Sequence, residues 1–100
     1  MAQHIDAREL TEWQAKGIPM VLIDVRLAQI GTIPGAIHIP VTDLEDQEWH
    51  WDPNASVVVF CQYGRVASEY AAEVLEEQGY SHVFQLTGGI EAWNAALSPG

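Results

Sequence analysis

Basic residues are scarce in this sequence. Four Lys and Arg residues stand against 14 Asp and Glu residues, so the formal net charge at pH 7 is -10 over 100 residues. Proteins bind nucleic acids largely by neutralising phosphates with Lys and Arg, and a chain of this charge is repelled by them. The composition therefore argues against a nucleic-acid partner.

Long apolar runs are also missing, and there is only one cysteine. No stretch approaches the ~20 apolar residues that a membrane span needs, and residues 1–10 lack the apolar run of a secretory signal. Cys61 has no second cysteine with which to form an internal disulfide, and a free thiol fits a reducing compartment. We therefore expect a cytoplasmic protein with no membrane partner.

The patterns that mark metal and nucleotide sites are absent as well. The four histidines have no metal-ligand spacing; they are His4, His38, His50 and His82. The pair Gly88-Gly89 lacks the third glycine or the following lysine of a nucleotide fingerprint, and a tight turn explains it. We expect neither a metal ion nor an organic cofactor.

What the sequence does contain indicates one folded domain over residues 1–100. Its hydrophobic content of 48% is too high for a disordered chain. A domain of this length buries somewhat more than ~60% of the surface that its unfolded chain exposes, which suffices for one core.

Short apolar runs alternate with helical patterns along the chain. The predicted strands cover residues 20–24, 36–39, 56–60 and 82–86. The predicted helices cover residues 7–16, 66–78 and 90–97, and Thr42 with Glu45 forms a capping box that starts a short acidic helix ending near residues 49–51. Asp6 and Glu9 form another capping box. This alternation predicts an open α/β domain with a mostly parallel sheet.

The most apolar run, SVVVF, leads directly into Cys61. Sites in open α/β sheets lie beyond the carboxyl ends of the strands. Gly64 can curl the backbone into an anion-binding nest, and the helix that follows contributes its positive dipole end. Arg65, the only basic residue after Arg26, adds charge there. These features predict that Cys61 is a thiolate at neutral pH, rather than a small buried apolar residue at a strand end.

Four segments of the sequence together resemble the rhodanese-like family, in particular its single-domain sulfurtransferases. The segments are LIDVR, TIPGAIHIP, VVVFCQYGR and LTGGIEAW, which occur in the family's order and span essentially the whole chain. The resemblance implies a single rhodanese-like domain, with a five-stranded parallel sheet flanked by helices.

The resemblance also implies roles for individual residues. Cys61 matches the nucleophile that accepts sulfane sulfur. The loop whose backbone amides hold the persulfide, and which would contact substrate, is matched by Gln62, Tyr63, Gly64, Arg65, Val66 and Ala67. Asp24 and Arg26 match a strand-end pair that is mainly structural. The family loop usually has an arginine five places after the cysteine, whereas here Val66 holds that place and Arg65 precedes it.

By this resemblance the chain is a sulfurtransferase. Cys61 would take sulfur from a donor such as thiosulfate and pass it from a persulfide to cyanide or a thiol, on a small molecule or a protein. One alternative is a non-catalytic interaction module with the same fold. The other is an enzyme like the related phosphatases and arsenate reductases, but their loops place an arginine six residues after the cysteine, where this chain has Ala67.

Overall fold

The computed structural model describes residues 2–27, 33–46, 51–63 and 65–97. Five strands form one sheet with the order β1-β5-β4-β2-β3, and every neighbouring pair is parallel. The strands are β1 (Gln3–Ile5), β2 (Val21–Asp24), β3 (Ile37–His38), β4 (Ser56–Phe60) and β5 (His82–Leu86). The expected five-stranded parallel sheet is confirmed.

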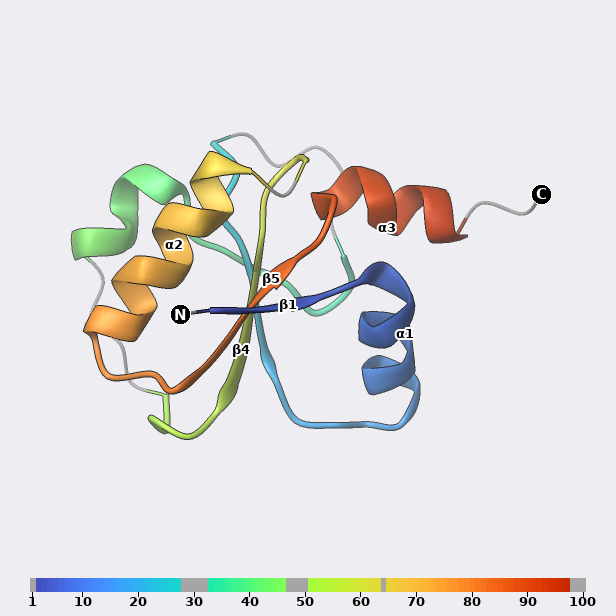
Figure 1. The fold of residues 1–100 in the computed structure, drawn as a ribbon, viewed down its shortest axis with the longest axis horizontal. Helices are drawn as coiled ribbons and strands as arrows, with labels where there is room; N and C mark the ends of the chain where they lie inside the picture. The colour runs from blue at the N-terminus through green and yellow to red at the C-terminus, as the bar shows by residue number, and fades with distance from the viewer. Residues whose placement is uncertain (1, 28–32, 47–50, 64, 98–100) are drawn as a thin grey trace.

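Helices cover both faces of this sheet (Figure 1). They are α1 (Ala7–Ala15), α2 (Val66–Glu77) and α3 (Gly89–Leu97), together with the 3-10 helix η1 (Val41–Asp46). In Figure 1, α2 and η1 lie on one side of the sheet, and α1 and α3 lie on the other. None of the helices among the described residues combines the length and the apolar character that crossing a membrane would require.

The central strand β4 is buried on both of its faces. Val57 and Val59 belong to the core cluster under α2 and η1, whereas Val58 and Phe60 belong to the cluster under α1 and α3. All four side chains have no exposed surface. An apolar run without polar alternation is what such a strand requires, because helices cover both faces of a parallel sheet. The carboxyl end of β4 consequently lies in the middle of the sheet, with strands on both sides.

Apart from element ends that differ by one residue, the observed elements follow the predicted ones with two differences. Strand β1 was not predicted, because its sequence QHI has no apolar alternation; it forms by pairing with the edge of β5. The short acidic helix is a 3-10 helix over Val41–Asp46. Its predicted continuation toward residues 49–51 falls on residues 47–50, which lie outside the described residues. Asp6 caps α1 as expected, since its Oδ1 accepts a hydrogen bond from the Glu9 N–H at 2.8 Å.

Candidate active site

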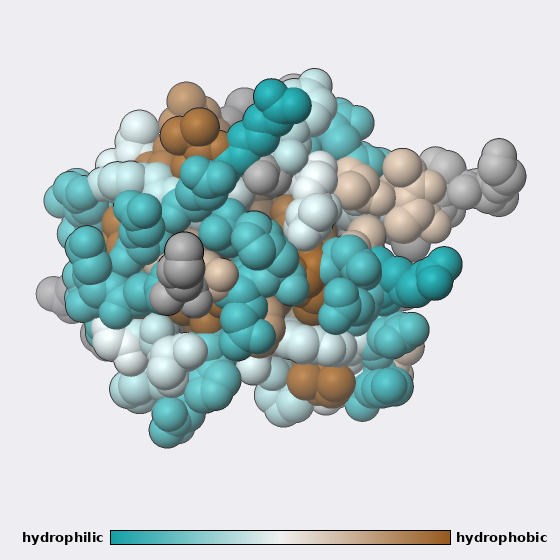
Figure 2. All heavy atoms as spheres, in the orientation of Figure 1, coloured by the Kyte–Doolittle hydropathy of each residue, from teal (hydrophilic) through white to brown (hydrophobic). Residues whose placement is uncertain are grey.

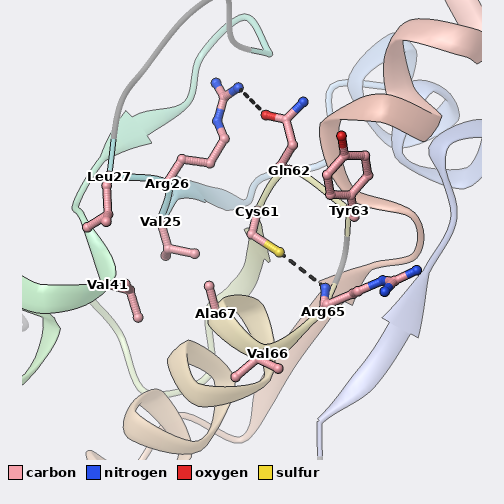
Figure 3. A pocket seen from close by; sticks show the side chains of 10 residues that line it. All are labelled: Val25, Arg26, Leu27, Val41, Cys61, Gln62, Tyr63, Arg65, Val66 and Ala67. Atoms are coloured by element: carbon pink, nitrogen blue, oxygen red, sulfur yellow. Dashed lines mark hydrogen bonds between the residues drawn. The ribbon is translucent and has the colours of Figure 1, made fainter.

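Cys61 directly follows β4 and lies at the floor of a surface cavity of about 420 Å³ (Figure 3). The residue is 7% exposed. The cavity is lined by Val25, Arg26, Leu27, Val41, Cys61, Gln62, Tyr63, Arg65, Val66 and Ala67. The strand thus carries a nearly buried sulfur to a position that a small ligand can reach.

The sulfur of Cys61 has hydrogen-bond partners from the start of α2. The backbone N–H of Arg65 donates to Sγ at 3.2 Å, and the thiol lies 3.5 Å from Ser68 Oγ. Burial raises the pKa of Cys61, but the Ser68 hydroxyl and the backbone N–H groups of Arg65, Ser68 and Tyr63 lower it by more. The pKa of Cys61 therefore lies below the ordinary value for a cysteine.

The amino end of α2 explains why anionic sulfur is favoured here. The first N–H groups of a helix have no partner within the helix, and the helix dipole places partial positive charge beside them. Arg65 is the N-cap residue of α2, and its own N–H donates to Sγ. Ser68 is fully buried. Its Oγ accepts from the Cys61 thiol and its hydroxyl donates to the Arg65 carbonyl at 2.9 Å, which fixes the Oγ next to the sulfur.

Arg65 contacts the sulfur through its backbone. In Figure 3 the Arg65 side chain extends away from Cys61, and the residue is exposed. From the sequence, the charge of Arg65 is expected to act at the thiolate. The geometry instead assigns that contact to the amide, which any residue except proline could supply at this position.

A buried ion pair lies at the side of the cavity formed by the end of β2. Arg26 Nη2 lies 2.7 Å from Asp24 Oδ2, and Arg26 Nε lies 3.0 Å from Oδ1, so the pair is bidentate at the end of β2. The hydrogen bonds that Arg26 donates to Asp24 raise the pKa of Arg26. This pair agrees with the structural role expected of these two residues.

Gln62 connects that ion pair to α3. Its Oε1 accepts from Arg26 Nη1 at 3.2 Å, as Figure 3 shows, and its Nε2 donates to Glu91 Oε1 at 2.6 Å. The backbone is held in the same way, because the N–H groups of Ile90 and Glu91 donate to the carbonyls of Cys61 and Gln62 at 2.9 and 3.1 Å. The first turn of α3 therefore fixes the residues that follow β4.

The structure places five of the six predicted loop residues around one cavity. Gln62, Tyr63, Arg65, Val66 and Ala67 all line it with Cys61. The sixth residue, at position 64, lies outside the described residues, so its predicted backbone curl stays a prediction.

Sequence reasoning missed several residues of the site. Ser68 was not among the predicted site residues, although a small hydroxyl in the first turn of the helix after the cysteine is a signal for it. Val25, Leu27 and Val41 also line the cavity. They follow other strands, and nothing in their local sequence indicates that they meet Cys61.

No metal centre is built into the described part of the chain. No group of three or more His, Cys, Asp or Glu side chains there could hold a metal ion.

Comparison with known proteins shows the family to which this chain belongs. Residues 2–96 match the family model for the rhodanese-like domain. The chain belongs to the rhodanese-like family. It is 34% identical over 98 residues to the thiosulfate sulfurtransferase GlpE of Ectopseudomonas mendocina, a match that covers 95% of this chain and 87% of that protein.

Solved structures of rhodanese-like proteins agree with this assignment. The human single-domain sulfurtransferase TSTD1 superimposes with a TM-score of 0.85 at 28% identity, covering 98% of this chain and 100% of that chain. A rhodanese-like domain from Anabaena also gives a TM-score of 0.85, at 29% identity, over 99% of this chain and 78% of that chain. The chain is thus a single rhodanese domain related to sulfurtransferases.

Proposed function

We propose that this protein transfers sulfane sulfur through a persulfide on Cys61. The Cys61 thiolate attacks the outer sulfur of thiosulfate, the S–S bond of the donor breaks, and sulfite leaves. The persulfide then gives its terminal sulfur to cyanide or to a thiolate, and Cys61 is regenerated as a thiolate. No metal or organic cofactor takes part in these steps.

One observation carries the proposal. Cys61 Sγ lies at the floor of the cavity, 3.2 Å from the N–H of Arg65 at the start of α2. A persulfide ends in one sulfur anion, which backbone N–H groups and a helix dipole can stabilise without a cationic side chain. The lowered pKa of Cys61 supports the same nucleophile.

The two alternatives receive less support from the site. Phosphoryl transfer needs a bidentate arginine over three oxygens; Ala67 holds the position of that arginine, and the Arg65 side chain extends away from the sulfur. A non-catalytic module would have no use for a hydrogen-bonded thiol of lowered pKa at the floor of a cavity. A cytoplasmic, reducing location goes with this proposal because the mechanism needs a free thiol.

Steady-state kinetics test the proposal. Thiosulfate and cyanide should give thiocyanate with parallel double-reciprocal lines, as a ping-pong enzyme requires. Cys61→Ala should abolish turnover while changing the free energy of unfolding by only about 1–2 kcal/mol, because it removes one sulfur atom at a strand end. Retained turnover in that variant, or hydrolysis of an aryl phosphate that depends on Cys61, would overturn the assignment.

A further inference from the structure

The rim of the Cys61 cavity carries more exposed apolar surface than an inorganic donor needs. Val66 is 76% exposed, Leu27 is 68% exposed and Tyr63 is 60% exposed, and all three line the cavity. Single exposed apolar residues are common on protein surfaces, but several around one site mark a place where an apolar group or another protein binds. Thiosulfate and cyanide have no apolar group that could use this rim.

A second hollow continues the first along α2. It has a volume of about 560 Å³ and shares Val41, Val66 and Ala67 with the Cys61 cavity. We call it the α2 groove; its lining residues are Val41, Thr42, Glu45, Val66, Ala67 and Tyr70. It lies between η1 and the first two turns of α2. Figure 2 shows hydrophobic atoms gathered at the upper left of the face in view, where the first turn of α2 lies in Figure 1.

The far end of the α2 groove is acidic. Glu45 accepts a hydrogen bond from the Tyr70 hydroxyl there. That bond raises the pKa of Tyr70, with smaller contributions from burial and from the charges of Glu77 and Glu73, which follow Tyr70 along α2. Of the four Lys and Arg residues, all of which the structure describes, none lines the α2 groove. A ligand in the groove would therefore meet apolar surface first and negative charge beyond it.

We propose that the sulfur acceptor is a cysteine in an extended segment of a partner protein, with an apolar residue next to it and a Lys or Arg shortly after. This inference rests on the proposed sulfur transfer. The cysteine would reach the Cys61 persulfide, the apolar residue would cover Val66, and the cation would lie at Glu45. Val66 and Tyr70 are one helical turn apart, about 6 Å, and Cys61 lies beyond Val66. An extended chain advances about 3.3 Å per residue, so the cation belongs roughly two to four residues from the cysteine.

The transfer step balances without another reactant. The partner thiol first loses its proton to solvent. Its thiolate attacks the outer sulfur of the Cys61 persulfide, a new S–S bond forms on the partner, and the old S–S bond breaks. Cys61 leaves as a thiolate and the partner holds the persulfide, so one neutral sulfur atom has moved.

Two short peptides test this acceptor. The Cys61 persulfide is first loaded with thiosulfate, excess donor is removed, and acetyl-CLGK-amide or acetyl-CLGE-amide is added as the acceptor. The rate of peptide persulfide formation is followed by mass spectrometry. We expect the Lys peptide to react roughly three- to tenfold faster than the Glu peptide at low salt, the range of one or two exposed ion pairs, and the difference to shrink at high salt.

Charge-reversal variants test whether Glu45 causes the preference for the Lys peptide. Glu45→Lys should reverse or abolish the preference for the Lys peptide. Glu12→Lys changes the net charge equally but lies on α1, across the sheet, and should keep the preference. Tyr70→Phe removes the hydrogen bond to Glu45 while keeping its charge, and should also keep the preference.

The outcomes separate this inference from the function on which it rests. Suppose that Cys61 takes up sulfur but that Glu45→Lys and Glu12→Lys change the peptide preference equally. That result would overturn the proposed acceptor and leave the proposed sulfur transfer intact. A lack of sulfur uptake would overturn the proposed function and the acceptor together.

Discussion

The hydrogen-bond partners of the Cys61 sulfur lie within seven residues along the chain. The Arg65 N–H and the Ser68 hydroxyl both belong to the start of α2, so one strand-to-helix connection supplies the nucleophile and the groups that favour its anion. Burial acts in the opposite direction by raising the pKa of Cys61, and the hydrogen bonds outweigh it. The reactivity of the thiol is thus a local property of this connection.

Ser68→Ala should raise the pKa of Cys61, because it removes a hydroxyl that stabilises the thiolate. The rate of alkylation by iodoacetamide as a function of pH measures that pKa. Its midpoint should lie below the ordinary cysteine value in the parent and should move up in the variant. Arg65→Ala keeps the N–H at Sγ and should leave the midpoint nearly unchanged. A shift with Arg65→Ala as large as that with Ser68→Ala would show that the guanidinium charge acts on the sulfur after all.

The lowered pKa of Cys61 also makes the free energy of unfolding depend on pH. Because the pKa of Cys61 is lower in the folded chain than in the unfolded chain, ionisation of the thiol stabilises the fold above the unfolded pKa. That contribution is lost as the pH falls through the folded pKa. Ser68→Ala should therefore lose part of a stabilisation that is present only above the folded pKa of Cys61, in addition to any effect of the substitution that does not depend on pH.

At the scale of elements, α3 fixes the backbone of the site by hydrogen bonds. Its first turn carries the N–H groups that bind the carbonyls of Cys61 and Gln62. The turn that leads into α3 uses left-handed backbone at Gly88, with φ of 76°. A Cβ at Gly88 would lie 2.6 Å from the Cβ of Ala92, so this position needs glycine for both its backbone and its space.

Gly88→Ala should destabilise the fold more than Gly17→Ala. Both positions have positive φ, which costs an L-residue about 1–2 kcal/mol, but a Cβ at Gly17 meets nothing within 4 Å. The contact with Ala92 should add about 1–3 kcal/mol of overpacking in Gly88→Ala and slow sulfur transfer by displacing the start of α3. Urea denaturation gives both free energies of unfolding; equal losses for the two variants would mean that the Ala92 contact does not constrain the turn.

The elements were predictable where their sequences have strong local patterns. The strands at 56–60 and 82–86 and the cap at Asp6 were predicted as observed, because unbroken apolar runs and capping boxes act locally. Strand β1 was not predictable, since QHI becomes a strand only through pairing with β5. The site was likewise predictable only in part. Cys61 and its loop are contiguous in the sequence and were named as candidates from it. The hydrogen bonds from Arg26 to Gln62 and from Gln62 to Glu91 join three distant segments and could not be predicted from local patterns.

The whole molecule carries a formal charge of -10, which repels a dianionic donor at long range. The local groups at Cys61 act over a few ångströms, whereas the net charge acts over a Debye length, about 30 Å at 0.01 M ionic strength and about 8 Å at 0.15 M. In the proposed function, the approach of thiosulfate and its capture would therefore be governed by different charges.

Raising the ionic strength from 0.01 to 0.15 M should raise kcat/KM for thiosulfate a few-fold, because salt screens the repulsion from the net charge. The alkylation rate of Cys61 by iodoacetamide, which is uncharged, should change little at a pH where the thiol is fully ionised. If kcat/KM for thiosulfate instead fell with salt, attraction by the site would outweigh the net charge of the chain.

The measurement that tests the central claim most directly is the mass of the intact protein after incubation with thiosulfate. The account predicts a gain of one sulfur atom, mapped to the peptide that contains Cys61, which disappears on addition of cyanide and is absent in Cys61→Ser. An unchanged mass under conditions where Cys61 still reacts with iodoacetamide would contradict it, because the thiolate would then be present and unable to take sulfur from the donor.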